Sequence, residues 1–283
     1  MVNFSQFLLE RGNFNETDIE NCFFDANFQE SEFLAFVDSL LAIPLWKNAQ
    51  DHQGYYKKAC RILSKAADDF ARFNANEPPY HSRSHFKDVC LGVSILLQYQ
   101  DPGDVSSLDF KDDDAWVLLL SAIGHDFGHN GSVNRCPFEL ELQSIEYVKR
   151  ILLTSELPTS FANKLIDRMK PIILATDPTC IKKVFNAYSD DDKNTPFSLG
   201  NYLNVLIIEA DLMGSTLPTY GEKLSQKLSK EWLVENSDQA IFIATTKGRF
   251  NFLNSFQFIS PAAQRIGLEV MRKKIAWKLN EII

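Results

Sequence analysis

Residues 116–124, with the sequence WVLLLSAIG, are largely apolar and lead directly into His125 and Asp126. A helix that is apolar on every side is buried at the centre of a protein. Two neighbouring polar side chains at the end of such a helix are unfavourable in a core unless they are paired or bind a metal ion. The run therefore predicts a central helix that carries a polar site at its carboxyl end.

Apolar residues recur along most of the chain with the helical period of about 3.6, and alternating strand patterns are hard to find. We therefore expect an all-α fold, a compact bundle of many helices that forms a single domain over residues 1–283. Residues 1–50 could form an N-terminal helical subdomain. The predicted helices cover residues 84–99, 112–124, 139–153, 161–176 with an internal Pro171, 202–211, 220–233 and a last helix from residue 261.

The last predicted helix has the clearest boundaries. Ser260 is a suitable N-cap, and Pro261 suits the first helical position. Its expected buried stripe consists of Leu268, Met271, Ile275, Leu279 and Ile282. By contrast, residues 188–201 are rich in Asp, Ser, Asn and Gly and predict a long loop between helices.

The composition limits the classes of partner. The formal net charge of −8 argues against binding along a nucleic-acid polymer, which requires clustered Lys and Arg. No apolar run approaches the roughly 18 residues that a membrane span needs, and the N-terminus lacks the basic region of a secretory signal. Five cysteines without C-x-x-C spacing are typical of free thiols in a reducing compartment. We therefore expect a cytoplasmic protein with no membrane partner.

Four of the five histidines stand in two short segments, YHSRSHFKDV at residues 80–89 and HDFGH at residues 125–129. Imidazole and carboxylate groups are ligands that zinc and other divalent first-row metals take, and a catalytic site leaves at least one coordination position for water. The clustering of these side chains therefore indicates a catalytic metal site.

A four-ligand site needs one carboxylate beyond His85, His125 and Asp126. Asp211 is the first choice, because it ends the apolar segment LNVLIIEAD, where a buried carboxylate without a cation would be unfavourable. Glu209, in the same segment, is the competing choice.

Four motifs follow one another along the chain: Y-H-x-x-x-H-x-x-D-V at residues 80–89, H-D-x-x-H-x-G-x-x-N at 125–134, I-L-A-T-D at 173–177 and A-D-L at 210–212. In this order they resemble the catalytic domain of the class I cyclic nucleotide phosphodiesterases, a branch of the HD metallohydrolase superfamily. The second motif matches the family's core at every required position. The resemblance implies a helical bundle around a two-metal site, with its metal-site core over about residues 80–260.

The resemblance also implies two divalent metal ions, zinc in the tighter site and magnesium or manganese in the second. His85, His125, Asp126 and Asp211 would hold the tighter ion, and Asp126 would bridge to the second. His129 corresponds to the histidine near the water shell of the second ion.

Further roles follow from the same motifs. His81 corresponds to the family's general acid, and we expect Glu141 to steady it, with Glu139 as the alternative. Asp177 corresponds to a residue of the inner site that contacts metal-bound water, and Tyr80 belongs to the expected substrate-binding residues.

Purine recognition in this family resembles a slot in which a glutamine hydrogen-bonds the base edge and a phenylalanine clamps the base face. When Phe258 is aligned with the clamp, Ser255 stands at the glutamine position. Asn254, Gln257 and Gln264 are then the candidates for contacting the base. The sequence therefore leaves the preferred base open.

The resemblance implies hydrolysis of a 3′,5′-cyclic nucleotide, cAMP or cGMP, to the 5′-monophosphate. A metal-bridging hydroxide would attack phosphorus while His81 protonates the departing ribose oxygen. The first alternative is an HD-type phosphohydrolase that acts on another nucleotide, such as a mononucleotide or a cyclic dinucleotide. The second alternative is an inactive module that binds nucleotide and signals to a partner.

Overall fold

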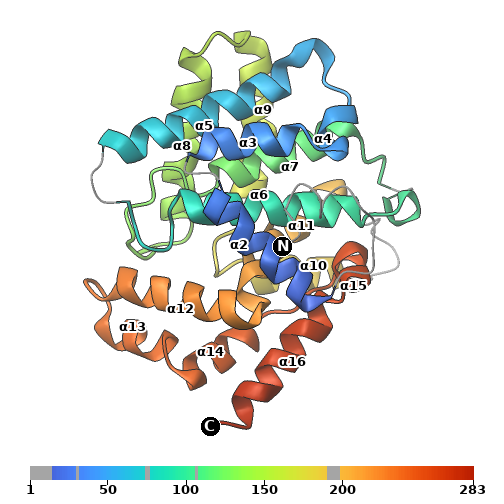
Figure 1. The fold of residues 1–283 in the computed structure, drawn as a ribbon. Coiled ribbons are helices and arrows are strands. Elements are labelled where there is room, and N and C mark those ends of the chain that lie inside the picture. Colours follow the sequence, from blue (N-terminus) through green and yellow to red (C-terminus); the bar gives the residue numbers. More distant parts are fainter. Residues whose placement is uncertain (1–14, 30–31, 74–76, 106–107, 190–197) are drawn as a thin grey trace.

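The computed structural model describes residues 15–29, 32–73, 77–105, 108–189 and 198–283. Within these residues every regular element is a helix (Figure 1). The predicted all-α class is therefore confirmed for the described part of the chain. No helix there is long and apolar enough to cross a membrane.

The helices fall into three consecutive groups along the chain. The first group comprises α2 (Glu16–Gln29), α3 (Phe33–Leu41), α4 (Pro44–Asn48) and α5 (Tyr55–Phe73). The second group comprises α6 (Arg83–Gln98), α7 (Asp112–Gly124), α8 (Glu139–Thr154), α9 (Thr159–Leu174), α10 (Ile181–Ser189) and α11 (Leu199–Met213). The third group comprises α12 (Pro218–Trp232), α13 (Ser237–Ile243), α14 (Thr246–Leu253), α15 (Pro261–Ile266) and α16 (Leu268–Asn280).

Helices α6, α7 and α11 form the centre of the bundle. As its apolar sequence predicts, α7 is buried from Asp114 to Gly124. Helices α6 and α11 lie very close together, because a Cβ atom on Gly92 would be only 2.8 Å from the carbonyl oxygen of Ala210. This close approach brings the start of α6 beside the end of α11.

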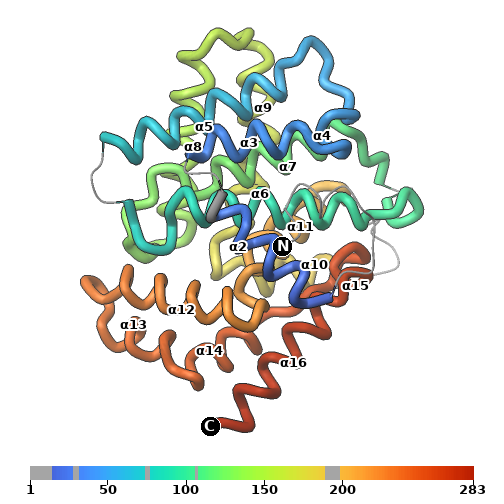
Figure 2. The backbone as a smooth tube through the Cα atoms, viewed as in Figure 1, coloured from blue at the N-terminus to red at the C-terminus, as the bar shows by residue number. Residues whose placement is uncertain are grey.

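The other helices cover this centre on two sides. In the view of Figure 1, α3, α5, α8 and α9 lie above α6, and α12, α13, α14 and α16 lie below it. Figure 2 shows the chain passing from the upper helices to the lower ones, with the C-terminus at the end of α16. Helix α2 packs against both α6 and α12. A single hydrophobic core includes Ile19 in α2 and Ala276 in α16.

The structure corrects the last predicted helix. Ser260 caps a helix as expected, because its side chain accepts a hydrogen bond from the Ala263 N–H. The segment is divided into α15 and α16 at Gly267, whose φ of 81° lies in the left-handed region. Ile282 follows the end of α16 and is 74% exposed, so it does not belong to the buried stripe.

The predicted loop over residues 188–201 is shorter at both ends than expected. Residues 188–189 belong to α10, and residues 199–201 belong to α11. Residues 190–197 lie outside the described residues, as do residues 1–14 of the expected N-terminal subdomain. The described part of that subdomain contributes Phe33, Phe36 and Trp46 to the common core.

Candidate metal centre and active site

Three helix ends place the expected metal ligands side by side. His85 lies in the first turn of α6, His125 directly follows α7, and Asp211 lies near the end of α11. The close packing of α6 against both α7 and α11 brings these ends together. Residues far apart in the sequence therefore meet at one point of the bundle.

Three donor atoms, from His85, His125 and Asp126, have the mutual spacing of ligands around one cation, and Asp211 joins them through His85. Nε2 of His85 lies 3.0 Å from Oδ1 of Asp211, 3.5 Å from Oδ2 of Asp126 and 3.3 Å from Nε2 of His125. Nε2 of His125 lies 3.0 Å from Oδ2 of Asp126. Ligands that bind one ion at about 2.1 Å are separated by roughly 3.0 to 3.4 Å in octahedral or tetrahedral geometry. The residues present therefore fit a divalent metal ion.

Hydrogen bonds around this group support the same assignment. The Nδ1 atom of His125 lies 2.9 Å from the carbonyl oxygen of Ala122, to which it donates when protonated. Such a bond leaves the Nε2 lone pair directed at the ligand group, as metal-binding histidines require. Glu209, the competing choice for the fourth ligand, is turned away: its Oε1 accepts hydrogen bonds from the backbone N–H groups of Ile259 at 2.6 Å and Ser260 at 2.8 Å.

The electrostatics of the group favour a cation. Burial lowers the pKa of His85, but Asp126 and Asp211 outweigh this effect and raise the pKa to about 10. Burial acts to raise the pKa of Asp126, yet the adjacent histidines, His125 first, hold it well below its usual range. The carboxylates thus create a negative potential inside the protein, which a divalent cation would neutralise.

A second pair of histidines lies beside the ligand group. The rings of His81 and His129 stack with centroids 3.7 Å apart, and Nε2 of His81 lies 4.0 Å from Oδ2 of Asp126. Nδ1 of His129 accepts a hydrogen bond from the Gly131 N–H at 3.0 Å. Burial, assisted by the charge of His81, lowers the pKa of His129 to about 3. His129 is therefore a neutral imidazole at physiological pH.

The prediction that Glu141 or Glu139 steadies His81 is wrong, because His81 contacts Glu231. Oε1 of Glu231 in α12 contacts Nδ1 of His81. The side chain of Glu141 instead accepts from the side-chain amide of Asn134, at 3.0 and 3.3 Å, and Glu139 pairs with Arg135. The physical reason is topological: the end of α12 lies beside the residues that lead into α6, whereas Glu141 faces the turn that follows α7.

Sequence reasoning missed Glu231, although a signal for it exists. Tyr220, Leu224 and Glu231 share one face of α12 at helical spacing, and all three are buried. An acidic side chain on an otherwise apolar stripe requires a partner. Glu231, His81 and His129 form a second close group of metal-type donors. Nδ1 of His81 faces Glu231 and Nδ1 of His129 accepts the Gly131 N–H, and these contacts suit the group to proton transfer.

Tyr80 lies beside the ligand group, whereas Asp177 is bonded to the segments on either side of α8 and α9. The ring of Tyr80 lies 4.7 Å from that of His85, and burial with nearby carboxylates raises the pKa of the Tyr80 phenol. Asp177 accepts hydrogen bonds from the Phe138 N–H at 2.7 Å and from the Thr179 N–H at 2.7 Å. Asp177 thus tethers the segment that leads into α8.

The expected purine-slot residues are divided between core and surface. Phe258 is 1% exposed, and its backbone N–H donates to Glu269 at 3.0 Å. Gln264 donates its side-chain N–H to the Phe258 carbonyl. Asn254 and Gln257 are exposed. Phe258 is therefore a core residue whose backbone is held by Glu269. The side chains of Asn254 and Gln257 instead lie at the surface.

Comparisons with known proteins identify the fold. No protein-family model matches the chain, and no curated protein matches its sequence. The phosphodiesterase domain of the rhodopsin phosphodiesterase from Salpingoeca rosetta is 18% identical, with a TM-score of 0.66 over 96% of both chains. LmjPDEB1, solved in complex with IBMX, is 17% identical, with a TM-score of 0.63 over 92% of this chain and 90% of that chain. The expected phosphodiesterase-type helical fold is therefore confirmed.

Proposed function

We propose that this chain, whose fold is that of phosphodiesterase catalytic domains, hydrolyses a 3′,5′-cyclic nucleotide to the 5′-monophosphate with the help of divalent metal ions. One observation carries the proposal: a group of two buried histidines and two partly exposed aspartates lies beside a histidine that is paired with a carboxylate. The group of histidines and aspartates suits a metal ion that activates water. The histidine paired with a carboxylate suits an acid that protonates a leaving group.

His85, His125, Asp126 and Asp211 would hold the tighter ion, for which zinc is our assignment. Asp126 is the ligand that would reach a second ion, magnesium or manganese, because its side chain also faces His81. Bound there, such ions would lower the pKa of coordinated water from about 15.7 toward about 7 and neutralise charge on the phosphoryl group.

His81 would deliver the proton to the departing ribose oxygen. Its Nδ1 faces Glu231, so its Nε2 is the atom directed toward the substrate side of Asp126. His129, neutral and stacked on His81, would restrict the ring's rotation and offer its Nε2–H as a hydrogen-bond donor. General-acid catalysis of this kind contributes about 10² to 10⁴-fold to the rate.

The substrate would be cAMP, cGMP or both. Asn254 and Gln257 remain our proposed contacts for the base, with Asp177 and Tyr80 on the inner side of the site. Phe258, at 1% exposed, lies in the core, so the expected clamp of the base is corrected. We place the activity in the cytoplasm, since all five cysteines are free and Cys22, Cys60 and Cys90 are buried as thiols.

The test is turnover of cAMP and cGMP by the purified protein supplied with magnesium or manganese, with the nucleotides separated by chromatography. We expect a 5′-monophosphate product that His125→Ala abolishes. His52→Ala is the matched control, because His52 is exposed and lies far along the chain from the ligand group. Absence of product from wild-type protein with bound metal would contradict the proposal.

A second candidate function is an HD-type phosphohydrolase for another nucleotide or a cyclic dinucleotide. The observation that favours it is Ser255 at the position where the resembled family has its glutamine. A panel of mononucleotides and cyclic dinucleotides in the same assay separates the two functions, because the metal group serves either substrate class.

A further inference from the structure

Residues 254–260 connect α14 to α15 and include both side chains that we propose for contact with the base. We call them the base segment. Asn254 and Gln257 are exposed, whereas Phe258 and Ser260 are 1% and 0% exposed. The base segment belongs to no helix, so its polar backbone groups depend on partners elsewhere in the protein.

Two side chains of α16 hold the base segment. Glu269 accepts the Phe258 N–H at 3.0 Å and pairs with Arg272 through bonds of 2.6 and 2.8 Å. Arg272, which is 6% exposed, donates to the carbonyl oxygen of Leu253, the residue before the segment. This ion pair therefore fixes the chain to α16 at two points.

Glu209 of α11 holds the same segment. Its side chain is 0% exposed, and its Oε1 accepts the N–H groups of Ile259 at 2.6 Å and of Ser260 at 2.8 Å. A buried N–H group without an acceptor is unfavourable, so these bonds determine where the segment lies. Glu209 stands two residues before the proposed metal ligand Asp211. One side chain thus joins the base segment to the helix end that carries a ligand.

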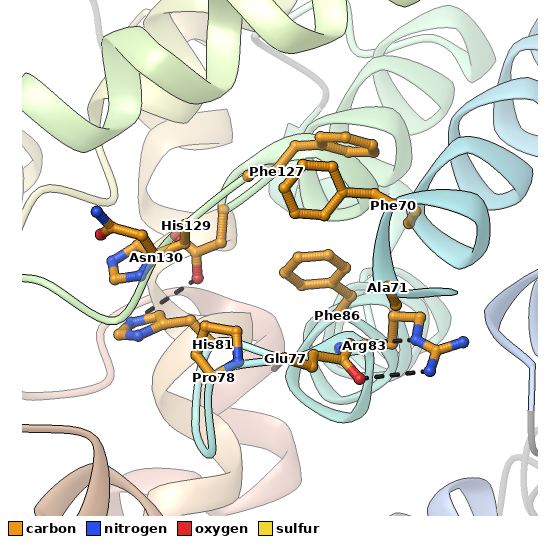
Figure 3. A pocket seen from close by; sticks show the side chains of 13 residues that line it. Phe70, Ala71, Glu77, Pro78, His81, Arg83, Phe86, Phe127, His129 and Asn130 are labelled. Carbon is orange, nitrogen blue, oxygen red and sulfur yellow. Dashed lines mark hydrogen bonds and ion pairs between the residues drawn. The ribbon is translucent and has the colours of Figure 1, made fainter. Parts of the chain in front are cut away.

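This connection matters because a cyclic nucleotide is rigid. Its phosphate is closed in a ring on the ribose, so the distance from phosphorus to the base varies little except by rotation about the glycosidic bond. In the proposed function the phosphate binds at the metal centre, beside the stacked rings of His81 and His129 (Figure 3), and the base binds at the base segment. Functional contacts must be held within about 0.5 Å of their productive geometry. The spacing between the two ends of the site must therefore match the ligand.

We propose that Glu209 is a positioning residue that sets the distance between the metal centre and the contacts for the base. The inference rests on the proposed hydrolysis of a cyclic nucleotide. Glu209 acts through the backbone of Ile259 and Ser260, so its loss weakens substrate binding while the chemistry at the metal continues. The role requires an acceptor oxygen at this position, which glutamine supplies and leucine lacks.

Steady-state kinetics with cAMP and cGMP test the proposal. We expect Glu209→Leu to raise KM at least about tenfold, with kcat changed by less than about threefold and with the metal content of the wild type, because uniform binding is lost. Glu209→Gln keeps an oxygen that accepts the two N–H groups, so its KM should stay within about threefold of the wild type.

Asp51→Leu is the matched control. Asp51 also accepts two backbone N–H groups, those of Tyr56 at 3.1 Å and Lys57 at 2.9 Å, but it does so at the start of α5. Its replacement should lower the Tm without changing KM. A KM that rises in this control as much as in Glu209→Leu would show that general destabilisation causes the effect, and would overturn the proposal.

Thermal unfolding shows whether Glu209→Leu folds. If it does not, Glu209→Asp takes its place, because the shorter side chain withdraws the acceptor by one methylene group. An unchanged KM in the folded variant, or a loss of metal or of kcat in its place, would overturn the positioning role. Absence of product from the wild type would contradict the proposed function and the positioning role together, so the two failures are distinguishable.

Discussion

Glu231 of α12 pairs with His81, which lies 150 residues earlier in the chain. One carboxylate oxygen faces Nδ1 of His81, and the other accepts the backbone N–H groups of Tyr80 at 2.8 Å and of His81 at 3.0 Å. Burial acts to raise the pKa of Glu231, but the contacts with His81 outweigh it and lower the pKa. An ionised carboxylate therefore fixes both the backbone and the ring of the proposed acid.

Replacing this carboxylate should slow proton transfer more than substrate binding. We expect Glu231→Gln to lower kcat by about 10 to 100-fold with KM changed by less than about threefold, and His81→Ala to lower kcat by about 10² to 10⁴-fold. Glu235→Gln is the matched control, since Glu235 is exposed four residues further on. Steady-state kinetics provide the measurement. Wild-type kcat in Glu231→Gln would remove the positioning role.

Removal of the metal should destabilise the protein as well as inactivate it. A ligand that binds only the folded state, at about 100 times its Kd, adds about 2.7 kcal/mol of stability. Chelation should therefore lower the Tm of the wild type, and Asp211→Ala should bind less metal and respond less to chelator. Metal content by mass spectrometry and thermal unfolding provide the readouts. A Tm that chelator leaves unchanged would argue against a structural contribution of the metal.

A methyl group at Gly92 should separate the helices that carry the ligands. Its Cβ would lie 2.8 Å from the carbonyl oxygen of Ala210, the residue before Asp211. We expect Gly92→Ala to reduce the free energy of unfolding by about 1 to 3 kcal/mol, as overpacked cores do. It should also weaken metal affinity.

Gly103→Ala is the control for this substitution, because among the described residues no atom outside its chain neighbours lies within 4 Å of its added Cβ. Its free energy of unfolding should stay within about 0.5 kcal/mol of the wild type. Urea unfolding measures both variants. Equal stability of the two would show that α6 and α11 adjust to the methyl group.

Tyr56 should make stability fall at alkaline pH. Burial, followed by the charge of Asp113, raises the pKa of Tyr56 to about 12, against about 10 in an unfolded chain. The stabilisation from the neutral phenol is complete below pH of about 10 and is lost as pH rises toward about 12, by at most about 1.4 kcal/mol per pH unit. Tyr56→Phe keeps the ring beside Trp116 and lacks this loss.

Urea unfolding at pH 9 and pH 11 compares the two proteins. The decrease in unfolding free energy between these values should be smaller in Tyr56→Phe than in the wild type. An equal decrease would mean that other groups carry the alkaline effect.

The sequence alone was sufficient for the helical class and for the ends of α7, but the longest described helix, α5 with 19 residues, was not among the predicted helices. The predicted start and end of α7 agree with the structure, because its carboxylates precede an apolar run that can only be buried. The side-by-side placement of His85, His125, Asp126 and Asp211 could also be predicted, since their types and order along the chain carry the signal. Local patterns of this kind need no knowledge of which helices are neighbours.

Other features depended on the tertiary structure. Helical spacing continues through Gly267, so the break between α15 and α16 arises from its left-handed backbone, which spacing does not encode. Glu231 and Glu141 are both acidic residues on amphipathic helices, and only the position of α12 beside the residues that lead into α6 brings Glu231 to His81. Periodicity shows which face of a helix is buried, but the partner of that face is set by the packing of the whole chain.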